Sequence, residues 1–172
     1  MRKIVFRIAV SAALVACVLL ANSRAKVVRA ALSGYQEIAT VSSGAHGSFQ
    51  GKINPAETEL AYELEYAGLE GTITQAHIHL GARGTNGGIM IWLCGTGTNP
   101  GPAGTPVCPQ EGSVSRTVGA ADVIGPGGQG VAAGEFAEAL RAIRAGVAYA
   151  NVHTSIWPGG EIRGQIRDED GN

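Results

Sequence analysis

Near its carboxyl end the chain reads Val147-Ala-Tyr-Ala-Asn-Val-His-Thr-Ser-Ile-Trp-Pro-Gly-Gly-Glu-Ile-Arg-Gly-Gln-Ile166, a stretch typical of a β-hairpin. Residues with high β-propensity fill its two halves, Val147–Thr154 and Ile162–Ile166. The turn signal Pro158-Gly-Gly160 lies between them. The hairpin also gathers a histidine, a glutamate and an arginine, so we expect polar chemistry as well as structure in this part of the chain.

Upstream of the hairpin, the clearest pattern runs from Thr58 to Gly68, where apolar and mostly acidic residues alternate. A period of two predicts an antiparallel strand with one buried face and one wet face. Five further strands are predicted at Val27–Leu32, Gly44–Ile53, Ile73–Leu80, Ile89–Leu93 and Ser113–Val118.

One segment, Glu135–Ala145, breaks the β pattern. Its apolar residues recur at helical spacing and Gly146 follows as a natural stop, so it predicts one short helix. With about eight short strands, the chain is expected to form an all-β domain in which two antiparallel sheets pack as a Greek-key β-sandwich. The polar residues Asp168–Asn172 are expected to form a disordered tail.

The first 25 residues resemble a secretory signal peptide. They begin with basic residues, and the apolar run Ile8–Leu20 is short for a membrane span. We therefore expect a secreted or periplasmic protein. Two alternatives stay open: Leu14-Val-Ala-Cys17 is similar to a lipobox, so lipidation of Cys17 would anchor the protein at the cell envelope, and an uncleaved signal would hold it in the membrane.

The charge of the mature chain limits its partners. Cleavage after Ala25 would remove four basic residues and no acidic ones, which changes the formal net charge from −1 to −5. An acidic domain without basic clusters is not expected to bind nucleic acid.

Cys94 and Cys108 flank a loop rich in glycine and proline. An exported protein meets an oxidising environment, so we expect a disulfide between them. The alternative, a pair of buried free thiols, fits poorly with such a loop. In the chain-entropy model, closing a loop of about 15 residues stabilises the fold by roughly 3 kcal/mol.

Five blocks follow one another in order along the chain. They are Leu32-Ser-Gly-Tyr-Gln-Glu37, Ala76-His-Ile-His79, Gly84-Thr-Asn-Gly87, Ala148-Tyr-Ala-Asn-Val-His-Thr154 and Gly160-Glu-Ile-Arg-Gly-Gln-Ile166. Together they resemble the CHRD domain, the module repeated in chordin and found singly in bacterial exported proteins. The resemblance covers roughly residues 30–167. It implies a β-sandwich of immunoglobulin-like or superoxide-dismutase-like shape, and no particular activity.

Three histidines are candidates for a shared site. His77 and His79 are two residues apart, so on a strand their side chains lie on one face. If the carboxyl-terminal hairpin pairs with that strand, His153, Glu161 and Arg163 converge with them.

One interpretation of the cluster is a metal site for copper or zinc, with His77, His79 and His153 as ligands. His46 is a further candidate ligand. With only four histidines, the chain has too few imidazoles for a bridged two-metal copper/zinc site. Imidazole nitrogens more than about 6 Å apart could not share an ion whose Zn–N bonds run near 2 Å.

The other interpretation is a structural polar network. In it Arg163 pairs with Glu37 or Glu161, and the histidines hydrogen-bond to backbone carbonyls and hydroxyls. The sequence favours this network over the metal site.

The functional expectation follows from the resemblance and from the absence of a recognisable catalytic constellation. We expect a non-enzymatic binding or structural module that recognises an extracellular protein or glycan. The alternative is a metal-binding domain, redox-active if the metal is copper.

Overall fold

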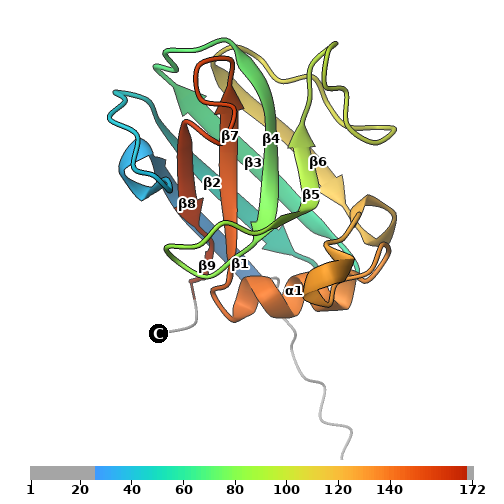
Figure 1. The fold of residues 1–172 in the computed structure, drawn as a ribbon. Helices are drawn as coiled ribbons and strands as arrows, with labels where there is room; N and C mark the ends of the chain where they lie inside the picture. The colour runs from blue at the N-terminus through green and yellow to red at the C-terminus, as the bar shows by residue number, and fades with distance from the viewer. Residues whose placement is uncertain (1–25, 170–172) are drawn as a thin grey trace, which may run out of the picture.

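The computed structural model describes residues 26–169 and shows a β-rich domain with one α-helix (Figure 1). The predicted signal peptide, residues 1–25, lies outside the described residues, as do residues 170–172. The strands are β1 (Lys26–Ser33), β2 (His46–Ile53), β3 (Leu60–Ala67), β4 (Ile73–Leu80), β5 (Gly88–Cys94), β6 (Gly112–Val118), β7 (Ala148–Thr154), β8 (Ile162–Gln165) and β9 (Arg167–Asp168).

All strand pairs are antiparallel and form one continuous path in the order β5-β4-β7-β8-β1-β2-β3-β6, with β9 beside β1. In Figure 1, β4, β5 and β7 cross in front of β2, β3 and β6, so the sheet is nearly barrel-shaped. The antiparallel β class and the single short helix are thus confirmed. The two separate Greek-key sheets, and the immunoglobulin-like or superoxide-dismutase-like shape, are not confirmed, because β8 pairs with β1 at Arg163 and Ser33 and joins the halves.

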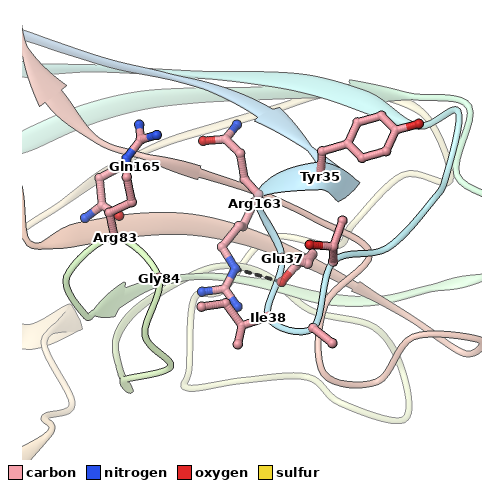
Figure 2. A pocket seen from close by; sticks show the side chains of 10 residues that line it. Tyr35, Glu37, Ile38, Arg83, Gly84, Arg163 and Gln165 are labelled. Carbon is pink, nitrogen blue, oxygen red and sulfur yellow. Dashed lines mark hydrogen bonds and ion pairs between the residues drawn. The ribbon is translucent and has the colours of Figure 1, made fainter.

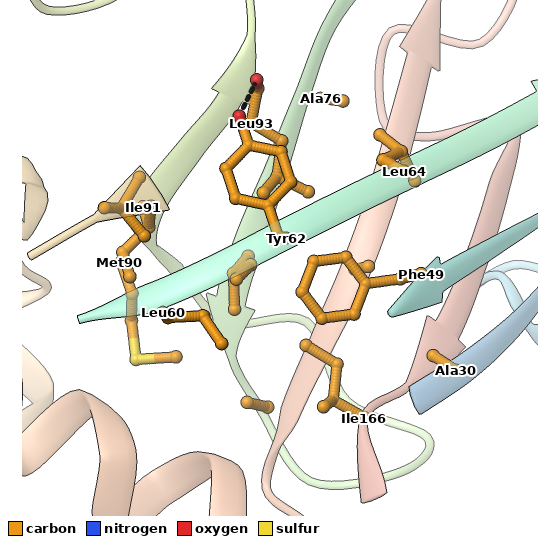
Figure 3. Close-up of a cluster of buried hydrophobic side chains, with 14 of the residues drawn as sticks. Ala30, Phe49, Leu60, Tyr62, Leu64, Ala76, Met90, Ile91, Leu93 and Ile166 are labelled. Atoms are coloured by element: carbon orange, nitrogen blue, oxygen red, sulfur yellow. Dashed lines mark hydrogen bonds between the residues drawn. The ribbon is translucent and has the colours of Figure 1, made fainter. Parts of the chain in front are cut away.

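The alternation in β3 produces the core. Its even-numbered residues from Leu60 to Tyr66 are buried, while Ala61, Glu63 and Glu65 are exposed. Figure 3 shows Tyr62 reaching across the interior, where its hydroxyl donates a hydrogen bond to the Leu93 carbonyl at 2.5 Å. The two layers are therefore held by apolar burial and by at least one directed polar contact.

The helix α1 (Phe136–Arg144) lies across one end of the sheet (Figure 1). Its apolar face, including Phe136, Leu140 and Ile143, is buried against the core. Gly146 follows with φ 67°, a left-handed conformation that favours glycine after a helix. No helix among residues 26–169 has the length and apolar character that crossing a membrane requires.

A disulfide joins Cys94 and Cys108, whose Cα atoms are 5.0 Å apart. The loop that it closes folds back over β5. An added Cβ at Gly101 would lie only 2.7 Å from the ring of Trp92, so this glycine lets the loop pack directly on the tryptophan. The closed loop therefore covers one side chain of the outer face of the sheet.

Two residues of the predicted tail of residues 168–172 lie within the described part of the chain. Asp168 pairs with Val28 in β9, and the Glu169 amide donates to the Val27 carbonyl at 3.0 Å. Residues 168 and 169 are thus held against β1 by backbone pairing, and residues 170–172 lie outside the described residues.

Candidate functional site

A layer of buried polar side chains lies on the outer face of the sheet, opposite the apolar core. It comes from three neighbouring strands, in which His77 pairs with Asn151 and Asn151 pairs with Arg163. Its members are His77 and His79 of β4, Tyr149, Asn151 and His153 of β7, and Arg163 of β8, all at most 7% exposed. The loops before β2, β5 and β8 contact these side chains, so the layer is enclosed.

The three histidines form a compact cluster. One ring nitrogen from each of His77, His79 and His153 lies within 4.8 Å of the others. The closest contact joins His77 Nδ1 and His153 Nε2, which are 3.3 Å apart. His46 is exposed and is not part of this group, so the cluster consists of three imidazoles.

Backbone carbonyls fix the orientation of two rings. His79 Nδ1 is 2.9 Å from the Gly87 carbonyl oxygen, and His153 Nδ1 is 3.0 Å from that of Pro158. A carbonyl oxygen only accepts, so each Nδ1 carries the proton and each Nε2 keeps a lone pair. Because His153 Nε2 is then an acceptor, His77 donates to it through its own Nδ1–H.

This proton arrangement leaves two nitrogens without a partner. His77 Nε2 and His79 Nε2 are buried, and neither has a hydrogen-bond partner within the described part of the chain. Buried polar atoms in folded proteins nearly always have one. Both atoms are bare imidazole lone pairs, the form in which histidine binds a metal ion.

Burial also keeps the three rings neutral. It lowers the pKa of His77 to about 2 and that of His79 to about 4, and it lowers the pKa of His153 as well. A positive charge on a neighbouring ring would lower the pKa of His77 and His79 further, and the Arg163 guanidinium lowers the pKa of His79 and His153. The cluster is therefore uncharged at neutral pH.

Aromatic rings border the cluster. The Trp92 ring meets His77 edge to face with centroids 4.3 Å apart, and the Tyr149 ring stacks on His79 at 4.9 Å. The guanidinium carbon of Arg163 lies 4.6 Å from the centroid of Tyr149. Sequence reasoning did not assign these rings to the site, although Tyr149 shares the period-two face of His153.

Next to the histidines, Arg163 forms a buried ion pair with Glu37 (Figure 2). Its Nε donates to Glu37 Oε2 at 2.7 Å, and Asn151 donates to Oε1 at 2.6 Å. The other guanidinium nitrogens donate to the Thr85 carbonyl and to Asn86 Oδ1. Burial raises the pKa of Glu37 even though these donors oppose the shift. Of the two carboxylates considered from the sequence, Glu37 is the partner of Arg163.

Glu161, the other carboxylate, has a separate role. It is fully buried and accepts hydrogen bonds from Ser43 Oγ, the Glu70 amide and Thr154 Oγ1, each at 2.8 Å. It therefore ties the loops before β2 and β4 to the end of β7, apart from the arginine.

The glycine in the hairpin turn makes room for this layer. Gly160 has φ 128°, and an added Cβ would lie 2.6 Å from Glu37 Oε1 and 2.5 Å from Asn151 Nδ2. Only a residue without a side chain allows the carboxylate and the amide to meet there.

Comparison with known proteins gives one match. A family model described as the CHRD domain matches residues 28–166, most of the chain. No curated protein and no solved structure matches the chain.

Proposed function

The chain belongs to the CHRD domain family, and from this premise we propose that it is an exported, non-enzymatic binding module whose buried histidine cluster binds one copper or zinc ion. His77, His79 and His153 would supply one imidazole nitrogen each. The family membership supports a binding or structural module, and the histidine cluster supports a metal ion as one of its ligands.

The observation that carries the metal site is the pair of unpartnered Nε2 atoms of His77 and His79. A purely structural network satisfies its buried polar atoms, since each unsatisfied one costs about 1–3 kcal/mol. The Glu37–Arg163 group meets that standard, because both carboxylate oxygens accept hydrogen bonds. The histidine cluster leaves two buried nitrogens without a hydrogen-bond partner among the described residues, so a structural role alone does not account for it.

The orientation of the rings supports the same proposal. Metal-binding histidines usually donate their second ring N–H to a carbonyl or carboxylate. His79 and His153 make this bond to Gly87 and Pro158. One ring nitrogen from each histidine lies within 4.8 Å of the others, inside the limit of about 6 Å for nitrogens that share an ion.

Metal titration tests this proposal. Purified protein without residues 1–25, stripped with a chelator, is expected to bind one equivalent of copper or zinc. The variant His77→Ala/His79→Ala is expected to bind more than about 100-fold more weakly, since loss of even an outer-shell partner costs about 10–100-fold. The matched control His46→Ala should keep the wild-type affinity, because its imidazole is exposed and outside the cluster. Unchanged uptake by a folded double variant would exclude the site.

A second candidate function, recognition of an acidic glycan, is favoured by a hollow of about 400 Å³ beside the ion pair (Figure 2). Tyr35, 69% exposed, stands at its edge as a platform on which a sugar ring can stack. Arg83 also lines it and makes no side-chain hydrogen bond or ion pair with any residue from 26 to 169. Its guanidinium is suited to a carboxylate.

A glycan array tests this second candidate. The mature protein is expected to bind sugars that carry carboxylates, and Tyr35→Ala/Arg83→Ala is expected to reduce that binding by about 10-fold or more, as for loss of a stacked ring and a charged hydrogen bond. Arg141→Ala, on the exposed face of α1, is the control. A wild-type protein that binds no glycan removes this candidate and leaves the metal proposal standing.

A further inference from the structure

Resting on the proposed metal site, we infer that the cluster of His77, His79 and His153 selects a singly charged copper(I) ion over zinc(II) and copper(II). Three features of the cluster favour the singly charged ion: the charge of its ligands, the charges around it and the small number of ligands within reach.

The ligand set carries no charge. The carbonyls of Gly87 and Pro158 hold two of the rings in the neutral form, and the cluster includes no carboxylate or thiolate. A bound ion would therefore keep its full charge in a buried environment. The desolvation energy of an ion rises with the square of its charge, so a doubly charged ion is penalised about four times as strongly.

The surrounding charges do not compensate for a divalent ion. The buried carboxylates of Glu37 and Glu161 are already bound, one by Arg163 and Asn151 and the other by hydroxyl and amide donors. The Arg163 guanidinium lies over Tyr149, which stacks on His79, and it is paired with Glu37, so this ion pair adds no net negative charge beside the cluster.

The number of ligands favours the same ion. Zinc(II) sites in proteins are almost always tetrahedral, with water as the fourth ligand where the protein supplies three, and copper(II) favours tetragonal geometry, so either ion needs a water or another ligand besides three imidazoles. His77 is fully buried, His79 is 7% exposed, and the rings of Trp92 and Tyr149 border them. Copper(I), a d¹⁰ ion without a preference for tetragonal geometry, is satisfied by two or three ligands.

Among residues 26–169, no sulfur atom is part of the cluster. Thiolates and thioethers are the ligands that usually select copper(I). Here Cys94 and Cys108 are joined in the disulfide, and Met90 lies in the apolar core on the other side of the sheet. The preference would therefore arise from charge and coordination number.

Competition titrations test the inference. Metal-free protein without residues 1–25 would be titrated anaerobically with copper(I) against bicinchoninate, and separately with zinc(II) and copper(II) against chelators of known affinity. We expect one equivalent of copper(I) to bind at least about 100-fold more tightly than zinc(II). Tighter binding of zinc(II) or copper(II) would overturn the inference while leaving the metal site intact, whereas no binding of any of the three ions would overturn the proposed function itself.

A charge-changing variant gives an independent readout. His153→Asp places a carboxylate where the third imidazole lies, so the ratio of copper(I) to zinc(II) affinity is expected to fall by about 10-fold or more. Circular dichroism would confirm that the variant is folded. A ratio that stays the same in the folded variant would count against selection by charge.

Discussion

Replacing Arg163 with methionine is expected to lower the free energy of unfolding by about 3–5 kcal/mol, the usual cost of removing one partner from a buried ion pair. The side chains of Arg163 and Glu37 are 5% and 2% exposed, so the carboxylate would be left buried without its cation. The variant would also lose the hydrogen bonds to Thr85 and Asn86, which hold the loop before β5. Urea unfolding followed by fluorescence measures the change.

Two further variants test whether the loss of stability comes from leaving a buried charge without its partner. Glu37→Met/Arg163→Met removes both charges and is expected to recover part of the loss, because no uncompensated charge remains. Arg29→Met breaks the exposed ion pair with Glu169, whose partners are 55% and 40% exposed, and is expected to cost less than about 1 kcal/mol. Equal losses in Arg163→Met and Arg29→Met would contradict the assigned role of the buried pair.

Mild acid is expected to destabilise the metal-free protein strongly. The pKa of His77 falls from 6.5 to about 2 on folding and that of His79 falls to about 4, so the unfolded chain binds protons that the folded chain does not. The stability that these neutral rings provide is complete above the unfolded pKa and is lost as the pH falls toward the folded values. Each ring accounts for about 1.4 kcal/mol per pH unit, or roughly 5 kcal/mol for both between about pH 6.5 and about pH 4.5.

Variants of single histidines distinguish the contribution of these two rings to the pH dependence of stability from that of the carboxylates. His77→Gln keeps a neutral polar side chain and is expected to reduce the slope by about 1.4 kcal/mol per pH unit in that interval. His46→Gln, at an exposed position, should leave the slope unchanged. The measurement is urea unfolding at a series of pH values with a chelator present. The same slope in His77→Gln and wild type would mean that other groups cause the acid sensitivity.

Local features of this fold could be predicted from the sequence because local spacing determines them. The alternation from Leu60 to Tyr66 corresponds to the burial observed in β3, and the apolar stripe of Glu135–Ala145 corresponds to α1 within one residue at each end. The sequence also predicts that His77, His79 and His153 meet if the hairpin pairs with the strand of His77, and β7 does pair with β4.

Features set by distant pairings could not be predicted in this way. The contact between β8 and β1 turns two expected sheets into one, and nothing near Ser33 or Arg163 indicates it. The partner of Arg163 was left open for the same reason, since Glu37 is 126 residues away in the chain. Trp92 reaches His77 only through the register of β4 and β5, which includes shifts beside His77.

The nearly closed sheet leaves β5 and β6 as its two terminal strands. Unpaired strand edges are the usual templates for intermolecular aggregation. On β5, Ile91 bridges to Val123, and just beyond its end Gly95 bridges to Val107 in the disulfide loop. β6 exposes Ser113, Ser115 and Thr117, and Arg116 forms an ion pair with Asp122, so this edge is polar, which discourages pairing with a neighbour. Both margins of the sheet are thus protected against edge-to-edge pairing with a second molecule.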